Sequence, residues 1–511
     1  MTNITSHQGR LPVQLAPVLL CLLGLLPACS SLAPQYSRPA LPVAASYPAV
    51  TAGSAESAKS GGAAHAPNSA SLAGSALAMP SDWQHYFTDP ALQQLLTQAL
   101  AHNRDLRLAT LRVEQARAAL GYQQAALAPV IGAQGGSSRT HVPADLSLTR
   151  QPMITSQYQI GLGMAAWELD FWGKLASLRD AARAEYLATD AARQAATLGL
   201  IAQLADAYYA LREADQRLLL AQRTLVSRQE SFRIYSRRVA AGSASRLNLT
   251  QVETLLTQAQ ALAAQLEQQR AAALQALQLL VGQPITWQAA SSADSTLGEL
   301  PELAAGLPAA LLERRPDVRA AELQLQAAYA NIGAARAAYF PSISLTASGG
   351  TASAALDGLF KPGSGSWNFA PSVNLPLFDG GRREANLALM QARRDSAVAS
   401  YDKAVQAAFR DVANALSARH WLNQQVAIAS HALAVQRERA RLTQLRFDNG
   451  AAPYLDVLDA QRDLLSAEQQ LVQTRRALLS AGIAVFAALG GAPQTAPDGA
   501  AHPVLLPTPR S

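Results

Sequence analysis

The sequence predicts an α+β fold in which pairs of membrane β-strands alternate with very long helices. Three observations predict it: a unit that occurs twice along the chain, segments in which polar and apolar residues alternate, and helical stretches too long for a compact domain. A chain of 511 residues would otherwise suggest three or four globular domains. The repeat replaces that interpretation, because each copy contains both strands and helices.

The amino-acid composition excludes several classes of protein. Charged residues make up 15% of the chain, against roughly 25% in a typical soluble protein, which excludes a disordered polyelectrolyte and a protein that coats nucleic acid. The 2 cysteines are too few for a disulfide scaffold or a four-cysteine metal site. The net charge of +6 comes from arginines scattered along amphipathic segments. Such arginines are typical of solvated helix faces, so no nucleic-acid partner is expected.

The N-terminus has the features of a bacterial export signal. A basic residue, Arg10, precedes an apolar stretch from Leu11 to Leu26, which predicts a secretory signal peptide over residues 1–28. The small residue before Cys29 resembles the lipoprotein box, in which the cysteine thiol is acylated and becomes the new N-terminus. Ser30, in place of aspartate, implies sorting to the outer membrane by the same resemblance. The alternative is an ordinary signal-peptidase site with an incidental cysteine.

The body of the chain consists of one sequence unit that occurs twice. Asp105-Leu106-Arg107 recurs as Asp317-Val318-Arg319 at an offset of 212 residues, and Gly242 recurs as Gly450 at an offset of 208. The single change of offset predicts a four-residue length difference in one loop. The predicted parts are a signal peptide (1–28), a lipidated extension with an Ala/Gly/Ser-rich spacer (29–89), the first repeat (90–283), an inter-repeat linker (284–315), the second repeat (316–490) and a flexible tail (491–511).

Each copy is predicted to begin with a helix, over Leu92–Leu127 in the first and Asp317–Tyr339 in the second, and a proline follows each helix. Two strands come next in each copy, because polar and apolar residues alternate with period two. The alternating segments are Tyr158–Met164, Ser342–Ser348 and Trp367–Leu377. Strands of about ten residues suit a tilted membrane strand. The alternative is a surface hairpin packed on a soluble core.

A long helical stretch without proline follows the strands in each copy, over Gly173–Val239 and Gly381–Phe447. At 1.5 Å per residue each would reach roughly 100 Å, and no compact domain is that wide. After a glycine-containing turn, a second helix returns as far as Leu280 or Leu489. Apolar residues seven apart in the second returning helix predict a coiled-coil seam: Leu464, Leu471, Leu478 and Val485.

The strands are the predicted membrane element, because no run of about 18 apolar residues lies beyond the N-terminus. A four-stranded sheet leaves polar backbone groups at both edges, and in lipid every such group must be paired. Eight strands from two chains would fill their own interior with side chains, whereas twelve from three chains leave room for an aqueous lumen. The predicted assembly is therefore a trimeric 12-stranded β-barrel that continues into a long α-helical barrel. A tetramer with sixteen strands is the alternative.

Several motifs occur in a characteristic order. They are Cys29 with Pro34–Pro39, Trp83–Leu92, Trp167–Gly173, Leu375–Arg382, and Arg446–Gly450 leading into Leu455–Gln461. In this order they resemble the TolC/OprM family of outer-membrane efflux channels, in its lipoprotein (NodT-like) branch. The resemblance covers nearly the whole chain after the signal peptide. It implies a passive exit duct, lipid-anchored in the outer membrane with a periplasmic helical barrel, that needs no cofactor.

The same resemblance implies the partners and the cargo of the duct. A periplasmic adaptor would join its helical tips to an inner-membrane transporter of the RND type, or alternatively of the ABC or MFS type. The implied cargo is drugs or other small toxic compounds. A type I secretion duct and a duct for metal-cation efflux share this architecture and are the alternative functions.

Two acids near the predicted tip are candidates for a gate. Members of the family close the periplasmic end by coiling helices inward, where a ring of acids can bind cations, and Asp456 and Asp459 match those acids. Their first-copy equivalents, Asn248 and Gln251, are uncharged, so a trimer would present three carboxylates at each level. Like charges a few ångströms apart attract cations, which suits a selective constriction. The alternative is that both acids stabilise the start of the returning helix through its dipole.

The turns between long and returning helices are the predicted contacts for the adaptor. They contain Gly242 in the first copy and Gly450 in the second, and Arg238 and Arg446 occupy equivalent positions before them. These arginines either donate hydrogen bonds across copies or are ordinary solvated charges. Phe447 stands where some relatives have tyrosine, so a latch through that hydroxyl is not expected.

The motifs of common enzyme classes are missing from the sequence. The 8 histidines are dispersed, and the nucleotide-binding, metalloprotease and serine-hydrolase motifs do not occur. Neither a metal site nor catalysis is therefore expected. A periplasmic adaptor-like coiled-coil protein is the remaining class, and such a protein would not repeat a strand pair in each half.

Overall fold

The computed structural model describes residues 32–43, 83–288, 297–301 and 315–491. Cys29, the predicted signal peptide and nearly all of the predicted tail therefore lie outside the described residues. The chain divides into two compact units. The strand unit takes its residues from 1–40, 112–189 and 320–401, and the helical unit takes its residues from 41–111, 190–319 and 402–511.

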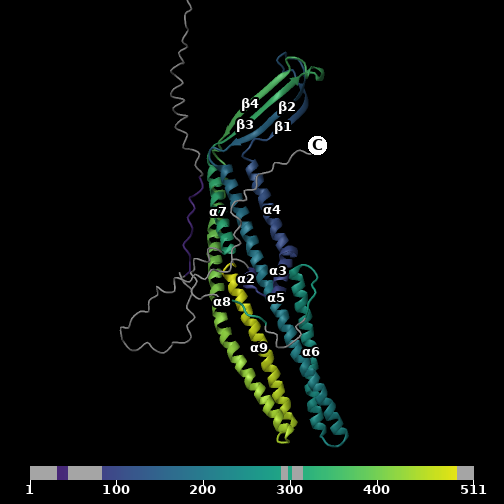
Figure 1. Cartoon of the computed structure of the whole chain (residues 1–511). Helices are drawn as coiled ribbons and strands as arrows, with labels where there is room; N and C mark the ends of the chain where they lie inside the picture. Colours follow the sequence, from purple (N-terminus) through teal and green to yellow (C-terminus); the bar gives the residue numbers. More distant parts are fainter. Residues whose placement is uncertain (1–31, 44–82, 289–296, 302–314, 492–511) are drawn as a thin grey trace, which may run out of the picture. The chain divides into compact units, whose positions relative to one another are not determined.

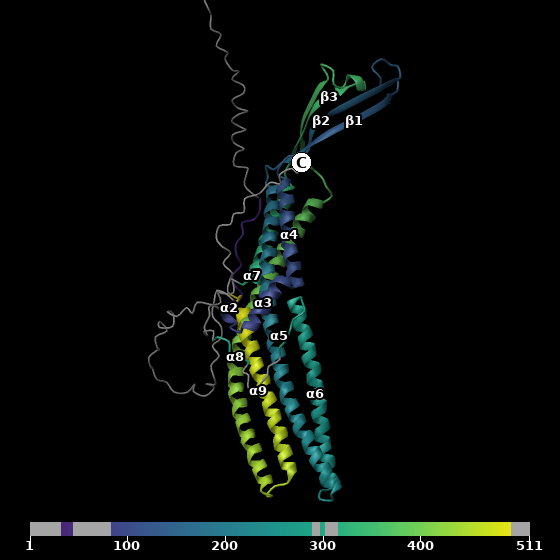
Figure 2. The ribbon, with the colours of Figure 1, turned by 45° about the vertical axis from the view of Figure 1, so that its right-hand side comes forward.

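The strand unit contains a four-stranded antiparallel sheet in the order β1-β2-β3-β4 (Figure 1, Figure 2). Its strands are β1 (Ile131–Val142), β2 (Met153–Leu169), β3 (Ser342–Ser353) and β4 (Gly365–Asn374), and a short 3-10 helix, η4 (Leu356–Gly358), lies between the last two. β2 of the first repeat pairs with β3 of the second, with Tyr158 opposite Ser353 and Leu169 opposite Ile343. The two repeats therefore share one sheet, and β1 and β4 form its edges.

Alternation of polar and apolar residues located the strands, with differences in length. Tyr158–Met164 lies inside β2, which is longer at 17 residues, and Ser342–Ser348 lies inside β3. β4 ends at Asn374, before the predicted end at Leu377. It also contains Pro371, which cannot donate a ladder hydrogen bond and lies here at an edge of the sheet formed by the single chain.

Two tryptophans tie the strands to the helices within the strand unit. The Trp172 ring stacks on Phe340 with centroids 4.7 Å apart, and its Nε1 donates to the Pro341 carbonyl over 2.7 Å. Trp167 Nε1 donates to the Leu127 carbonyl over 3.2 Å. Both carbonyls lie where the first helix of a repeat gives way to its first strand, so these indoles stabilise both connections.

Eight α-helices complete the described residues. They are α2 (Trp83–Tyr86), α3 (Pro90–His102), α4 (Arg104–Ala125), α5 (Lys174–Ala240), α6 (Arg246–Val281), α7 (Pro316–Ala337), α8 (Arg382–Asp448) and α9 (Tyr454–Ala488). α5 and α8 have 67 residues each, and both begin and end one residue from the predicted positions. The prediction succeeded because no proline or turn cluster interrupts either stretch.

The predicted single helix over Leu92–Leu127 is wrong, because the structure divides it into α3 and α4 at Asn103. Asn103 has extended backbone angles, with ψ of 131°. Its Oδ1 accepts a hydrogen bond from the amide of Leu106 over 2.9 Å, and its Nδ2 donates to the Leu280 carbonyl over 2.8 Å. The asparagine therefore caps a new helix and contacts the end of α6, which offsets the loss of helical hydrogen bonds.

The core of the helical unit collects side chains from both ends of the sequence. Tyr86 stacks on Phe486 of α9 with centroids 4.8 Å apart, and its hydroxyl donates to the Gly482 carbonyl over 2.8 Å. Asp89 caps α3 and accepts a hydrogen bond from the Tyr208 hydroxyl of α5 over 2.6 Å. The start of the first repeat is thereby packed against the last helix of the second.

α9 is the one described helix whose length and composition would allow it to cross a membrane. Half of its apolar window is buried within the chain, and Leu479, Ile483 and Phe486 belong to the core cluster of the helical unit. We therefore assign α9 to that core, in keeping with the sequence, which predicts no helical membrane span.

Candidate functional site

The α5–α6 turn and the α8–α9 turn have the same backbone geometry (Figure 1). Gly242 and Gly450 both adopt a φ of 71°, in the left-handed region that glycine favours. The amide of Ser243 donates to the Arg238 carbonyl and the amide of Ala451 to the Arg446 carbonyl, each over 2.8 Å. Such bonds close the C-terminus of a helix, so the two turns are equivalent in structure as well as in sequence.

The two equivalent arginines have different surroundings. The Arg238 guanidinium lies 5.5 Å from the centroid of the Tyr235 ring. Arg446 Nη2 instead donates to the Ala451 carbonyl of its own turn over 3.1 Å. Both side chains are exposed, and each of these contacts stays within the arginine's own helix or turn.

Asp456 and Asp459 lie in the first two turns of α9. Asp456 is exposed, and no side-chain hydrogen bond or ion pair joins it to another described residue. Asp459 is half-buried and pairs with Arg462 over 3.4 Å. The N-cap position of α9 belongs to Pro453, without a side-chain hydrogen bond, so neither acid caps the helix directly. Their negative charges still stabilise α9, because they lie near the positive N-terminal end of its helix dipole.

A cluster of aromatic and hydroxyl groups packs the start of α9 against α5. The rings of Tyr454 and Tyr235 stack with centroids 5.1 Å apart, and the Tyr454 and Ser231 hydroxyls share a hydrogen bond of 2.6 Å. The Phe447 ring also meets Tyr454, at 4.9 Å. Sequence reasoning missed Tyr454, because nothing in the local pattern shows a partner that lies 223 residues away.

A buried arginine extends this contact. Arg228 of α5 is 2% exposed, and its guanidinium donates to Gln461 Oε1 and to the Leu458 carbonyl, each over 3.1 Å. Burial lowers the pKa of Arg228, and the nearby Asp459 acts in the opposite direction. The candidate gate acid Asp459 therefore interacts electrostatically with Arg228, at the contact between α5 and α9, in addition to its ion pair with Arg462 on its own helix.

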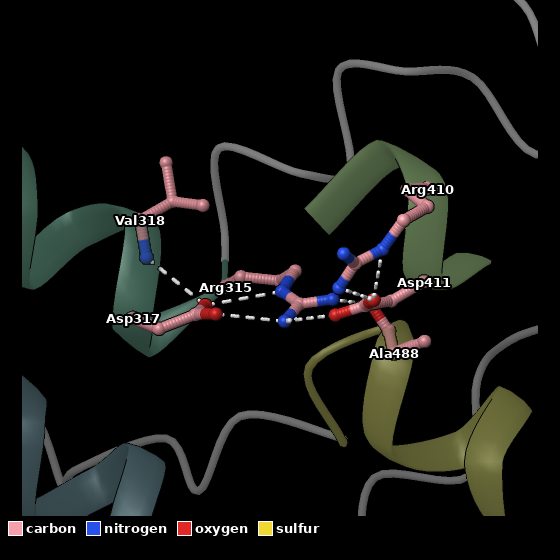
Figure 3. A network of polar contacts seen from close by, with 6 residues as sticks. All are labelled: Arg315, Asp317, Val318, Arg410, Asp411 and Ala488. Atoms are coloured by element: carbon pink, nitrogen blue, oxygen red, sulfur yellow. Dashed lines mark hydrogen bonds and ion pairs between the residues drawn. The ribbon is translucent and has the colours of Figure 1, made fainter. Parts of the chain in front are cut away.

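A second polar network joins the start of α7 to α8 and α9 (Figure 3). Arg315 donates to both carboxylate oxygens of Asp317, over 3.0 and 2.7 Å, and to the Ala488 carbonyl over 2.9 Å. It also lies 3.8 Å from Asp411, which pairs with Arg410 over 2.8 Å. Burial opposes ionisation of Asp317, but the hydrogen bonds and charge of Arg315 outweigh it and hold the pKa of that carboxyl below its ordinary value. The sequence repeat pointed to Asp317 but not to Arg315.

Comparison with known proteins gives consistent matches over the length of the chain. Residues 95–283 and 307–491 match the family model described as "Outer membrane efflux protein". The chain is 41% identical over 461 residues to the solvent efflux pump outer membrane protein SrpC of Pseudomonas putida, covering 90% of this chain and 95% of that protein. It is 40% identical over 474 residues to the outer membrane protein OprJ of Pseudomonas aeruginosa, covering 92% and 94%.

A solved structure supports the same conclusion. The open state of the Neisseria gonorrhoeae MtrE outer membrane channel superposes with a TM-score of 0.77 at 36% sequence identity, covering 91% of this chain and 98% of that one. The resemblance inferred from the sequence motifs is therefore confirmed, as are the four antiparallel strands, the long helices and the two-fold repeat.

Proposed function

The chain belongs to the outer membrane efflux protein family, and we propose that it conducts organic solvents and antibiotics out of the cell as the outer-membrane duct of an efflux pump. The family consists of efflux channels rather than enzymes. Relatives that match about nine-tenths of the chain are named for solvent, toluene and antibiotic efflux, which favours small organic compounds over secreted proteins or metal cations. The single observation that carries the proposal is this match over about nine-tenths of both chains.

The proposed channel is a homotrimer. β1 and β4 are both edges of the sheet, and nearly all of β1 and all of β4 are exposed in the single chain. Unpaired edge strands cannot persist in lipid, so the edges must pair with those of other copies. Three copies give the twelve strands that leave an aqueous lumen.

The proposed membrane attachment combines the strands with a lipid anchor at Cys29, after removal of residues 1–28. The lipoprotein-box residues before Cys29 support the anchor. The proposed partners are a periplasmic adaptor and an inner-membrane transporter of the RND type. The exposed turns that carry Gly242 and Gly450 support the adaptor contact, since Arg238 and Arg446 present positive charge there and Phe447 adds an aromatic ring beside Tyr454.

The proposed gate is formed by Asp456 and Asp459 of three copies. Asp456 is exposed in the first turn of α9 and makes no side-chain hydrogen bond or ion pair with another described residue, so its charge is available to solvent and cations. Three such carboxylates at one level would attract cations and repel anions at a constriction. Stabilisation of the α9 N-terminus is compatible with this role, because both effects need a negative charge at the same place.

The function can be tested in a bacterial strain that lacks its own outer-membrane efflux ducts but retains an adaptor and an RND transporter. Expression of the chain should restore survival in toluene and raise the inhibitory concentration of antibiotics. Restored protein secretion or metal tolerance, without either of these effects, would contradict the proposal and favour an alternative duct.

The gate can be tested in planar bilayers with the purified channel. Asp456→Ala combined with Asp459→Ala should raise the basal conductance several-fold and reduce cation selectivity. Glu253→Ala is the control, because Glu253 is an exposed acid near the start of α6, the returning helix of the first repeat. Unchanged conductance of the double variant, or an equal rise in the control, would count against the gate.

A further inference from the structure

A short segment close behind Cys29 is bound to α7; we call residues 32–38 the strap (purple in Figure 1). Arg38 Nε and Nη2 donate to the two carboxylate oxygens of Glu322 over 2.8 and 2.6 Å. The Tyr36 hydroxyl donates to Glu322 Oε1 over 3.0 Å. Burial and the hydrogen bond to Glu322 raise the pKa of Tyr36 to about 12. The Glu322 side chain is only 13% exposed, so the strap covers it from solvent.

The contacts continue along α7 in antiparallel order. The Tyr36 ring meets Tyr329 edge-on with centroids 5.6 Å apart. One residue before the end of α7, Arg336 Nη1 donates to the Leu32 carbonyl over 3.3 Å. The strap therefore begins beside the C-terminal end of α7, from which the chain continues into β3, and runs toward the N-terminal end of that helix.

A glycine on α7 makes room for the strap. Gly333 is buried, and a Cβ atom built on it would lie 2.8 Å from the backbone and the Cβ of Ala33. Any side chain at this position would displace the strap by contact with its backbone. Glycine is otherwise unfavourable inside a helix, by roughly 1 kcal/mol relative to alanine. The close packing of the strap explains why glycine occupies this position.

The first repeat shows the same helix without a strap. Gly121 of α4 is the equivalent of Gly333, at the offset of 212 residues, and a Cβ atom built on it meets nothing within 4 Å. α4 has no buried residue. Of the two equivalent helices, only α7 therefore has another segment packed closely against its glycine.

The strap also limits where Cys29 can lie. Leu32 lies three positions after Cys29, and an extended chain spans at most about 11 Å over that distance. Leu32 is held by the last turn of α7. An acyl group on Cys29 would thus lie within this reach of the C-terminal end of α7, where the chain continues into β3.

We propose that Glu322, Tyr329 and Gly333 form a docking track on α7 that binds the strap and holds the acyl chains of Cys29 beside the start of β3. The proposal rests on the acylation of Cys29 proposed above. The track would position the anchor through the strap, since its three residues contact the strap.

Release of the N-terminal peptide by chymotrypsin tests the track in the purified full-length protein. Chymotrypsin cleaves after tyrosine, and cleavage after Tyr36 releases the peptide 29–36 at a rate set by the undocked population. Glu322→Ala removes charged hydrogen bonds and should accelerate release by about tenfold or more. Gly333→Ala should also accelerate release, although alanine favours the helix.

Gly121→Ala is the matched control, because it places the same methyl group at the equivalent position of α4, where nothing lies nearby. It should leave the release rate unchanged. A wild-type rate as fast as that of Glu322→Ala would overturn the track. Equal acceleration by Gly121→Ala and Gly333→Ala would also overturn it, because the effect would then not depend on the strap.

Positioning of the anchor is tested in liposomes by comparing the acylated chain with a Cys29→Ser chain exported by a leader without a lipoprotein box. A short tether between lipid and strap raises the effective concentration of the strap at its track, so acylation should slow release several-fold. Six Gly/Ser residues inserted between Ser31 and Leu32 lengthen the tether, keep Ser30 in place and should abolish this difference. Equal rates for the acylated and unacylated chains, or a difference that survives the insertion, would overturn the positioning role.

The mass of the released peptide separates the two proposals. A peptide without acyl chains would refute acylation of Cys29, while the rates of the Glu322 and Gly333 variants would still decide whether α7 binds the strap. Acylated peptide released at equal rates from all variants would refute the track and leave the anchor intact.

Discussion

The two repeats close their first and last helices onto each other with the same geometry but with different chemistry. In the first, Asn103 donates to the Leu280 carbonyl over 2.8 Å. In the second, Arg315 donates to the Ala488 carbonyl over 2.9 Å. Both pairs obey the repeat offsets, 212 for the donors and 208 for the carbonyls. The repeat therefore preserves a donor facing the end of a returning helix, and it does not preserve the residue that supplies it.

The change of donor alters how each contact depends on its surroundings. Asn103 is neutral and also caps α4 through the Leu106 amide. Arg315 carries a charge, and it brings Asp317 and Asp411 into the contact (Figure 3). The first repeat thus relies on a helix cap and close packing, whereas the second relies on charge. Three substitutions or conditions test this difference.

The largest expected effect comes from the glycines that end the returning helices. Gly282 and Gly490 have φ of 81° and 90°, so alanine at either is strained by about 1–2 kcal/mol. A Cβ on Gly282 would also lie 2.5 Å from the His102 carbonyl oxygen, whereas a Cβ on Gly490 would meet Arg315 Cγ at 3.4 Å. Gly282→Ala should therefore lower the midpoint of thermal unfolding, followed by circular dichroism, clearly more than Gly490→Ala does.

Equal midpoints for the two glycine variants would show that the first repeat packs no more tightly at this junction than the second. The wild-type protein and Gly298→Ala serve as references, since Gly298 also has a positive φ of 87° but nothing within 4 Å of its Cβ position.

The donors themselves come next. Arg315→Ala should cost about 2 kcal/mol, because it removes charged hydrogen bonds, although the Asp317 and Asp411 side chains are 44% and 39% exposed and regain water. Asn103→Ala should cost about 1 kcal/mol, through one neutral hydrogen bond and a helix cap. Urea unfolding measures both. A larger loss of unfolding free energy for Asn103→Ala than for Arg315→Ala would contradict the claim that charge makes the second-repeat contact the stronger one.

The smallest effect is a pH dependence confined to the second repeat. The pKa of Asp317 is held below its ordinary value of 3.8 because Arg315 outweighs the effect of burial. A lowered pKa stabilises the folded protein above the ordinary value, and the contribution disappears as pH falls through the lowered one. Solvent screening keeps it small, since Asp317 is 44% exposed.

Hydrogen exchange in the first turn of α7, corrected for the intrinsic rate, should therefore show less protection at pH 3 than at pH 6. The Asn103 contact does not titrate, and Asp317→Asn should remove the pH dependence at α7. Persistence of the pH dependence in that variant would show that a group other than Asp317 causes it.

The sequence predicted the architecture because most of its helices and strands are evident from the local periodicity of apolar residues. The long helices were placed within one residue, since nothing interrupts their pattern. The break at Asn103 was missed because the residues on both sides favour a helix, and the gain that offsets the break is a bond to Leu280, 177 residues away. Asp456 and Asp459 were proposed as gate acids from the motif that follows the α8–α9 turn, and that role stays a prediction. Their neighbours Arg228 and Tyr454 were missed, because their contacts join segments more than 220 residues apart.

The sequence by itself determined the repeat, the order of strands and helices, and the equivalence of the two glycine turns, because each depends on residues close together in the chain. Only the tertiary structure decided how equivalent positions diverge. Gly121 and Gly333 are the same residue at the same repeat position, yet only Gly333 is covered by the strap. The physical reason is that the burial of each glycine depends on which distant segment packs against it. Local periodicity of the sequence does not show which segment that is.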